Sequence, residues 1–367
     1  MKKYLVTCDY NVESLVIEEI KQKIEEATEI EQFENFSHRV SFLVPNFDAQ
    51  KNNAILQKIL SLRSIHLVIE LKGTFYLENP TLENIKAKVM EIDLPELKTA
   101  KSFRASAERY GTHDFTSIEM TKHVAHTVIL RYQTPVSLTE YEYNLRIDII
   151  GHFVFLGYQI TDDVLSHRQG QGQEQGKYNK IERTFHHRAA TKHTLAYLML
   201  TLAGLKENDS LLDCTCGGGT IVLEAASMFG NTIKILAGDM HEKALEGTKE
   251  NLRLNNFDFV TVKELNARHL DETIADYVLE NGKIDKIVCN LPFGIQSAKQ
   301  VNMRGLYDQF LSSAYRILSK NGKIVVLTMR QGVFREVIFM IKKYKITKEY
   351  VTEAGGLYLH IFVLEKI

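Results

Sequence analysis

The stretch LLDCTCGGGT, residues 211–220, decides the fold of the second half of the chain. An apolar strand ends there at an acid, Asp213, and runs through three glycines into a helical pattern. Glycine lets the backbone turn tightly and approach a ligand at the carboxyl end of a strand. No third glycine follows Gly219 at the spacing of the dinucleotide-binding motif, and no Gly-Lys-Ser/Thr follows as in a P-loop. The sequence therefore matches neither of these two phosphate-binding motifs. The acid instead suits a cationic amino-acid group, with a purely structural turn as the alternative.

Apolar strands alternate with helical patterns around this turn, which predicts a mostly parallel, doubly wound sheet. The expected strands are 210–213, 234–239, 259–264, 285–290, 322–328 and 357–365. Asp239 ends the second strand, 20 residues after Gly219. A carboxylate at that place can accept hydrogen bonds from both hydroxyls of a ribose. Alone it could equally be a solvated strand end, but beside the glycine turn it favours a nucleoside site.

The third motif, Asn290-Leu291-Pro292-Phe293-Gly294, directly follows the strand 285–290. It would bring an amide, a backbone carbonyl and an aromatic face to the cleft at the strand ends, with the proline fixing φ. Acceptors on the two hydrogens of an exocyclic aromatic amine favour its pyramidal, nucleophilic form. The motif therefore indicates chemistry on a base amine, and a turn after a strand is the alternative.

The first half of the chain reads differently. Residues 1–72 follow a β-α-β-β-α-β order, which is ferredoxin-like. Residues 73–165 predict a helix at 81–92, a strand at 102–110, a helix at 117–132 and a hairpin of strands 141–149 and 152–160. The hairpin strands alternate apolar and polar residues, which predicts one solvated face. A Gly/Gln-rich stretch at 166–180 is typical of a linker.

The composition is that of a globular protein: 44% of the 367 residues are hydrophobic and 25% are charged. This excludes a disordered chain or a disulfide framework. The four cysteines form no CxxC pair and no metal spacing, so we expect a reduced, cytoplasmic protein without metal. No apolar run reaches membrane-spanning length, so we expect no membrane segment. Residues 98–195 hold 13 Lys and Arg against 10 Asp and Glu, and 8 of the 13 histidines, a weak indication of a polyanionic partner.

The C-terminal half resembles the class I S-adenosylmethionine-dependent methyltransferases that act on amino groups, whose motif is Asp/Asn-Pro-Pro-Tyr/Phe. The Asn-Leu-Pro-Phe-Gly variant is similar to that of the tRNA guanine-N2 methyltransferases that carry a THUMP domain. The first half contains segments similar to THUMP landmarks: Ser102-Phe103-Arg104-Ala105-Ser106, Arg109-Tyr110-Gly111, Tyr158-Gln159-Ile160 and Leu165-Ser166-His167-Arg168.

This resemblance implies an α/β protein of three parts. It implies a ferredoxin-like domain at 1–72, a THUMP RNA-binding domain at 73–165, a linker at 166–185 and a Rossmann-like methyltransferase domain with a seven-stranded, mostly parallel sheet at 186–367. The implied cofactor is S-adenosyl-L-methionine. The implied reaction is methylation of the exocyclic N2 of a guanosine in tRNA, with guanosine 6 of the acceptor stem as the best match and the THUMP region contacting the acceptor stem and 3′ end.

Site residues carry over from the family by position. The implied catalytic residues are Asn290, Leu291, Pro292 and Phe293. The implied cofactor-binding residues are Thr194, Asp213, Cys214, Gly217, Gly219, Thr220, Asp239, Met240, Asn266, Ala267 and Asn290. Among these, Asp213 and the glycines would hold the methionine end, Asp239 the ribose, and Met240 would lie against the adenine.

Several positions depart from the family pattern. Asn266 stands where an acid usually receives the adenine amine, Cys214 and Gly218 replace Pro and Ser, and Lys192-His193 replaces Arg-Pro. An rRNA guanine-N2 methyltransferase and a catalytically silent tRNA-binding protein remain as alternatives. The histidines 186, 187 and 193 are interpreted as surface or RNA-facing side chains, and the sequence does not define an oligomeric state.

Overall fold

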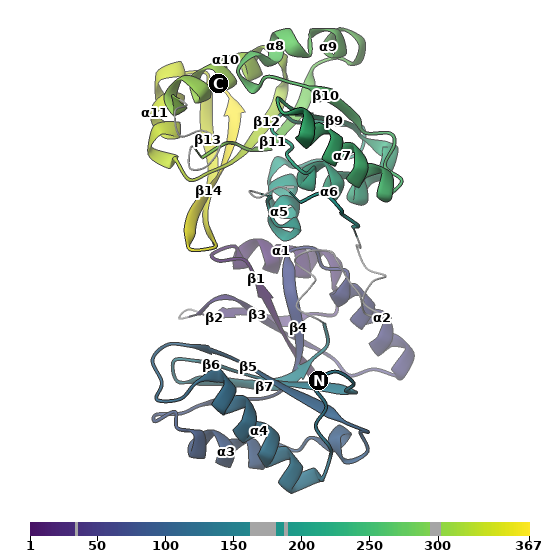
Figure 1. Ribbon diagram of the computed structural model, residues 1–367, viewed down its shortest axis with the longest axis vertical. Coiled ribbons are helices and arrows are strands. Elements are labelled where there is room, and N and C mark those ends of the chain that lie inside the picture. The colour runs from purple at the N-terminus through teal and green to yellow at the C-terminus, as the bar shows by residue number, and fades with distance from the viewer. Residues whose placement is uncertain (34–35, 162–180, 187–189, 294–301) are drawn as a thin grey trace. The chain divides into compact units, whose positions relative to one another are not determined.

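The computed structural model describes residues 1–33, 36–161, 181–186, 190–293 and 302–367. The chain forms two compact units. The first comprises Met1–Cys8 and Val16–Leu165, and the second comprises Asp9–Leu15 and Ser166–Ile367. Each unit is built around one seven-stranded sheet (Figure 1). The Gly/Gln-rich stretch and the segment Leu165-Ser166-His167-Arg168 lie outside the described residues.

The first unit follows the element order expected for its two halves. Its elements are β1 (Lys2–Cys8), α1 (Glu13–Lys23), β2 (Thr28–Phe33), β3 (Phe36–Val44), α2 (Ala49–Leu60), β4 (Ile65–Tyr76), α3 (Leu82–Glu91), a 3-10 turn η1 (Pro95–Lys98), β5 (Phe103–Tyr110), α4 (Ser117–Tyr132), β6 (Tyr143–Ile150) and β7 (Phe153–Gln159). Helix α4 has the predicted bounds because Thr116 and Glu119 form a capping box, each side chain accepting the other's backbone N–H. At its other end, Gln133 adopts a left-handed conformation with φ 59°.

The strands of both halves join in one sheet, ordered β2-β3-β1-β4-β7-β6-β5. Strands β3 and β6 are four places apart, which is about 19 Å in a flat sheet. Nevertheless the side chains of the two strands meet: Arg39 Nη2 of β3 lies 3.2 Å from Asp148 Oδ2 of β6. The sheet therefore curls until these two strands face each other across its inner surface.

This curl overturns the prediction that the hairpin of β6 and β7 has a solvated face. Every residue of β6 after Tyr143 is buried, including Arg146 and Asp148. The alternating polar residues lie on the inner surface, where they pair with one another instead of with water. The expectation was wrong because alternation distinguishes two faces of a strand but does not show what covers the polar one.

The second unit is doubly wound. Its elements are α5 (His193–Ala203), β8 (Ser210–Asp213), α6 (Thr220–Phe229), η4 (Gly230–Thr232), β9 (Lys234–Asp239), α7 (Glu242–Leu254), β10 (Thr261–Glu264), η5 (Ala267–His269), α8 (Leu270–Thr273), α9 (Ala275–Asn281), β11 (Ile284–Asn290), α10 (Met303–Ile317), β12 (Leu318–Thr328), α11 (Gln331–Ile341), β13 (Tyr344–Ala354) and β14 (Leu357–Lys366). The strand order is β10-β9-β8-β11-β12-β14-β13. The first five are parallel, β14 runs antiparallel to them, and β13 pairs antiparallel with β14 and so has the direction of the first five. The predicted seven-stranded, mostly parallel sheet is confirmed.

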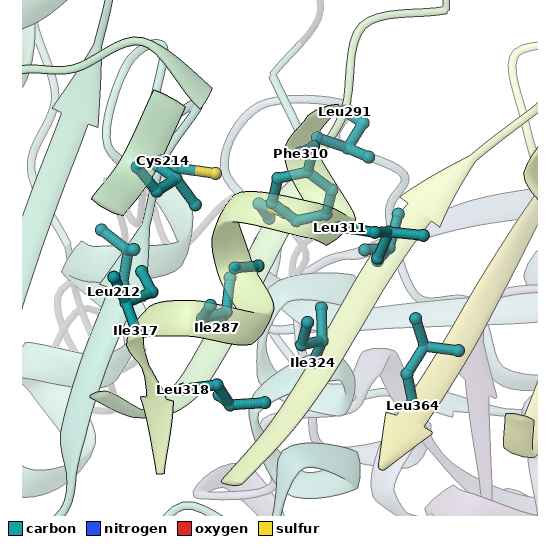
Figure 2. Packing of buried hydrophobic residues seen from close by; sticks show 14 of the residues in the cluster. Leu212, Cys214, Ile287, Leu291, Phe310, Leu311, Ile317, Leu318, Ile324 and Leu364 are labelled. Atoms are coloured by element: carbon teal, nitrogen blue, oxygen red, sulfur yellow. The ribbon is translucent and has the colours of Figure 1, made fainter. Parts of the chain in front are cut away.

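Helices cover both faces of this second sheet (Figure 1). Helices α5, α6 and α7 pack on one face, and α8 to α11 on the other. The second face carries a core in which Leu212 and Ile287 of the central strands, and Cys214 directly after β8, meet Phe310 and Leu311 of α10 (Figure 2). This core fixes the central strands, and with them the strand ends that carry the three motifs.

Candidate functional site

The three motifs meet at the carboxyl ends of adjacent strands. Strand β8 lies between β9 and β11: from β8 the chain runs outward through β9 to β10, and it then crosses to β11 on the other side of β8. This reversal is the switch point at which open α/β sheets bind ligands. Asp213 ends β8, Asp239 ends β9 and Asn290 ends β11. The structure therefore brings the predicted cofactor residues and the predicted catalytic motif to one edge.

The glycine turn after β8 is hydrogen-bonded to both neighbouring strands. The Gly217 N–H donates to Asp239 Oδ2 at 3.0 Å, and Thr215 Oγ1 donates to the Asn290 carbonyl at 3.1 Å. Gly217 and Gly219 have φ of 55° and 81°, a region that favours glycine. A Cβ at Gly219 would also lie 3.0 Å from the Thr248 methyl carbon. The turn needs these glycines for its shape, so the predicted tight turn is present.

Asp213 is a carboxyl group without a cationic partner among the described residues. It is 1% exposed, and its Oδ1 accepts the Thr215 N–H at 3.2 Å. Burial, together with the negative charge of Asp239, raises the pKa of Asp213 to about 8. A cation brought to this carboxyl would recover the energy lost by desolvation. The geometry thus fits the amino group expected there.

Asp239 connects the glycine turn to the start of α7. Its Oδ2 accepts the Gly217 N–H and its Oδ1 accepts the His241 N–H, both at 3.0 Å. Each carboxylate oxygen has a second lone pair and can accept a further bond. A ribose diol would therefore meet an acceptor whose orientation is already fixed.

Asn290 is held from two sides. Its Nδ2 donates to Thr191 Oγ1 at 3.0 Å, and its backbone carbonyl accepts from Thr215. Because the amide NH2 group is directed at Thr191, the orientation of the side-chain carbonyl is set as well. That oxygen is the acceptor which the predicted chemistry requires.

The rest of the motif consists of Leu291, which belongs to the core, and a loop whose backbone carbonyls accept hydrogen bonds from other side chains. The Leu291 side chain is buried in the core shown in Figure 2, so only its backbone can serve the site. The Pro292 carbonyl accepts from Tyr307 Oη at 3.4 Å, and the Phe293 carbonyl accepts from Arg330 Nε at 2.9 Å. Phe293 is half-buried, and Gly294 lies outside the described residues. Tyr307 and Arg330 carry no sequence signal that would have identified them as supports.

The remaining predicted cofactor residues differ in exposure. Met240 is 61% exposed after β9, as a residue placed against a ligand would be. The Asn266 Oδ1 accepts the Arg268 N–H at 3.0 Å and so caps η5, where Ala267 is half-buried. Cys214 is buried in the apolar core.

Two further predicted residues are tied to other side chains. Thr194 is buried and donates to Asp9 Oδ2 at 2.6 Å, and Thr220 accepts from Arg183 at 2.7 Å. The buried His193 lies 3.1 Å from Glu224, which contradicts the expectation of a surface histidine.

Residues 181–186 form a strap that sequence reasoning missed. Asn251 of α7 accepts the N–H groups of Thr184 and Phe185 at 3.0 and 3.1 Å, and donates to the carbonyls of Phe185 and Gly218. Asn255, one helical turn later, pairs with both backbone groups of Glu182. The spacing of these two asparagines, at i and i+4, is the only sequence signal that could have indicated the strap. The strap lies beside the glycine turn, although its first five residues were assigned to the linker.

These residues fit S-adenosylmethionine by the chemistry of their donor and acceptor groups. A buried acid faces the expected amino group, and a fixed carboxylate faces the expected ribose. Among the described residues, no group of three or more His, Cys, Asp or Glu side chains could hold a metal ion. None of the helices in the described ranges is long and apolar enough to cross a membrane. The four cysteines all lie within the described residues, where they are buried and form no disulfide.

Comparison with known proteins adds independent findings. Residues 180–359 match the family described as RMKL-like, methyltransferase domain. The chain is 30% identical over 313 residues to the tRNA (guanine(6)-N2)-methyltransferase of Thermus thermophilus, covering 85% of this chain and 87% of that protein. It is 25% identical to the tRNA (guanine(10)-N2)-dimethyltransferase of Methanocaldococcus jannaschii, covering 83% and 80%. The crystal structure of TrmN from Thermus thermophilus matches with a TM-score of 0.79 and 27% identity over all of both chains.

Proposed function

Because the chain belongs to the class I S-adenosylmethionine-dependent tRNA (guanine-N2) methyltransferases, we propose that it methylates N2 of guanosine 6 in the tRNA acceptor stem. The observation that carries this proposal is the hydrogen bond from Thr215 to the Asn290 carbonyl. It joins the turn that would hold the methyl donor to the motif that would hold the guanine. The relative with 30% identity is named for position 6, which favours that position over position 10.

The site assignments form part of this proposal. Asp213, Cys214, Gly217, Gly219 and Thr220 surround the methionine end of the cofactor. Asp239 accepts the ribose hydroxyls, Met240 covers the adenine, and Asn266 with Ala267 borders its amine. Thr194 supports the pocket through Asp9. When bound, S-adenosylmethionine supplies an electrophilic methyl group on a sulfonium.

The chain's own residues prepare the target amine. A guanine in a paired stem must leave the stack to reach the motif, at a cost of a few kcal/mol. Phe293 offsets part of this cost by stacking, about 1–3 kcal/mol per base. The side-chain oxygen of Asn290, Oδ1, accepts a hydrogen bond from the guanine N2 amine. This bond strengthens as the nitrogen becomes pyramidal. The methylated nitrogen is cationic and loses its proton to water, so no side-chain base is required.

The domain assignment is also proposed. Residues 1–72 form a ferredoxin-like domain, 73–165 a THUMP domain that contacts the acceptor stem and 3′ end, 166–185 a linker, and 186–367 the methyltransferase domain. The boundary after residue 165 has the support that one division between the two compact units falls between residues 165 and 166, with Asp9–Leu15 grouped in the second unit. If the first unit contributes phosphate contacts, tRNA affinity falls steeply with salt. We propose a cytoplasmic location, where tRNA is the available substrate.

The test uses the full chain, a labelled methyl donor and three tRNA transcripts: unaltered, with guanosine 6 replaced, and with guanosine 10 replaced. Nuclease digestion and mass spectrometry identify the product. We expect N2-methylguanosine in the unaltered and position-10 transcripts and none in the position-6 transcript. Loss of product only in the position-10 transcript would move the target to position 10. Methylation of ribosomal RNA alone, or tRNA binding without methylation, would support the two alternatives instead.

A further inference from the structure

Arg183 is a cation in an unusual place. It belongs to the strap 181–186, and its guanidinium donates to Thr220 Oγ1 at 2.7 Å, directly after the glycine turn. Arg183 Nη2 also lies 3.5 Å from His186 Nδ1. Its Nε is buried and has no acceptor within the described residues. Burial lowers the pKa of Arg183, and no carboxylate in the described part of the chain opposes that effect.

The strap holds this side chain in position. Asn251 and Asn255 bind the backbone on both sides of Arg183, and Asn251 also binds the Gly218 carbonyl. Gly247 of α7 makes room for the strap, because a Cβ there would lie 2.2 Å from the Phe185 ring. One asparagine thus ties the strap to the glycine turn. The guanidinium is therefore fixed relative to that turn.

The turn consequently has a titratable acid at one end and a cation at the other. Asp213 precedes it and is buried without a cationic partner among the described residues, while Arg183 sits at Thr220, which follows it. An amino-acid head group has the complementary pair of charges, an ammonium and a carboxylate. We infer that Arg183 binds the carboxylate of the methionine part of S-adenosylmethionine, opposite the ammonium at Asp213. The planar guanidinium suits a carboxylate because it can donate two parallel hydrogen bonds.

The inference rests on the cofactor placement proposed above and not on the identity of the RNA. A phosphate of the bound RNA is the other anion an arginine could meet. The methionine carboxylate is favoured because Arg183 lies at the glycine turn after β8, whereas the expected guanine lies at the motif after β11.

The test compares two ligands that differ only in the carboxylate, S-adenosylmethionine and its decarboxylated form, by calorimetry without RNA. For Arg183→Met we expect S-adenosylmethionine to bind about 10- to 100-fold more weakly, the size of a lost charged hydrogen bond. The decarboxylated ligand should bind the variant and the wild type within about threefold, because it has nothing to pair with the guanidinium. Arg183→Lys should recover part of the loss. Arg253→Met, which removes an exposed arginine of α7, is the matched control and should leave both affinities unchanged.

Each other outcome overturns the inference. Equal weakening of both ligands would mean that Arg183 shapes the pocket without contacting the carboxylate. Unchanged affinity for both, with weaker tRNA binding, would assign the side chain to an RNA phosphate. Thermal unfolding without ligand shows whether Arg183→Met is folded, and Arg183→Lys keeps the test decisive if it is not. Because no RNA is present, the result does not depend on which nucleotide is methylated.

Discussion

The two sheets have equal numbers of strands but place their charges in opposite ways. In the first sheet, Arg39, Arg146 and Asp148 lie in mid-strand on a buried surface. In the second sheet, Asp213 and Asp239 lie at strand ends. Helices cover both faces of the second sheet, so its strand centres are apolar and polar groups gather at the edge. The first sheet covers its inner surface by curling, and its buried charges must neutralise one another.

This difference separates a structural role from a functional one. The charges of the first sheet are paired: Asp148 accepts from Arg39 at 3.2 Å and from Arg146 at 2.8 Å, and Arg146 also reaches Glu108 at 2.8 Å. The two ionisable groups at the glycine turn of the second sheet, Asp213 and Arg183, have no oppositely charged side chain paired with them among the described residues. A paired buried charge stabilises one geometry, whereas an unpaired one is suited to a charged ligand.

The largest effect is expected in the first sheet. Asp148→Asn leaves two buried guanidinium groups with one half-exposed carboxylate, Glu108. Removing one member of a buried ion pair costs about 3–5 kcal/mol, so the first unit should unfold at a lower temperature. Calorimetric unfolding with added S-adenosylhomocysteine separates the two units, because the ligand raises only the transition of the unit that binds it.

The matched control for this prediction is Asp93→Asn. Asp93 also pairs with two cations, Lys98 and Arg131, but its side chain is 60% exposed. An exposed pair contributes about 0–1 kcal/mol, so this variant should unfold like the wild type. Equal unfolding temperatures for the Asp148 and Asp93 variants would show that the inner surface of the sheet is not closed.

The second effect concerns the motif at the end of β11. Asn290→Ala removes an acceptor whose bond is strongest in the transition state, so kcat should fall about 10²- to 10³-fold, with cofactor and tRNA affinity changed much less. Single-turnover methylation with parallel binding measurements checks this expectation. Asn290→Asp keeps an acceptor and should retain more activity, and Asn281→Ala, at the end of α9, should have no effect. A near wild-type rate for Asn290→Ala would make Asn290 a turn residue.

Sequence patterns predicted the second sheet well where its strands are buried and apolar. Five of the six expected strands agree within two residues at each end with β8, β9, β10, β11 and β14, and the sixth extends four residues earlier in β12. Strand β13 was missed because it is an edge strand with lysines such as Lys345 and Lys348, a polar pattern that protects sheet edges. In the candidate site, the glycines and the acids at strand ends could be predicted from the sequence. Thr191, Asn251 and Arg183 were not, because their roles depend on partners distant in the sequence.

A third, smaller effect concerns Asp239. Asp239→Ala removes the acceptor for the ribose hydroxyls and the bond to the Gly217 N–H. We expect S-adenosylhomocysteine to bind more weakly by about 1.5–3 kcal/mol, since the bonds share one carboxylate and are not additive. Calorimetry measures the affinity, and Asp258→Asn, an exposed acid after α7, is the control. The first unit should unfold as in the wild type. Unchanged affinity would contradict the ribose assignment.

The smallest effect is a pH dependence of cofactor binding set by Asp213. Its pKa of about 8 means that the free protein holds this proton at pH 7, whereas a bound ammonium favours the carboxylate. Binding at pH 7 should therefore release close to one proton, and affinity should rise with pH by at most about tenfold per unit until it levels off above pH 8. The raised pKa also means that the Asp213 contribution to the free energy of unfolding falls between pH 3.8 and 8. Calorimetry in two buffers of different ionisation enthalpy counts the released protons, and Asp213→Asn should abolish the release while Asp258→Asn keeps it. If the wild type took up protons on binding, or released none, Asp213 would not meet the cationic group of the cofactor. The contrast between paired buried charges in the first sheet and unpaired ionisable groups in the second would then have no functional meaning.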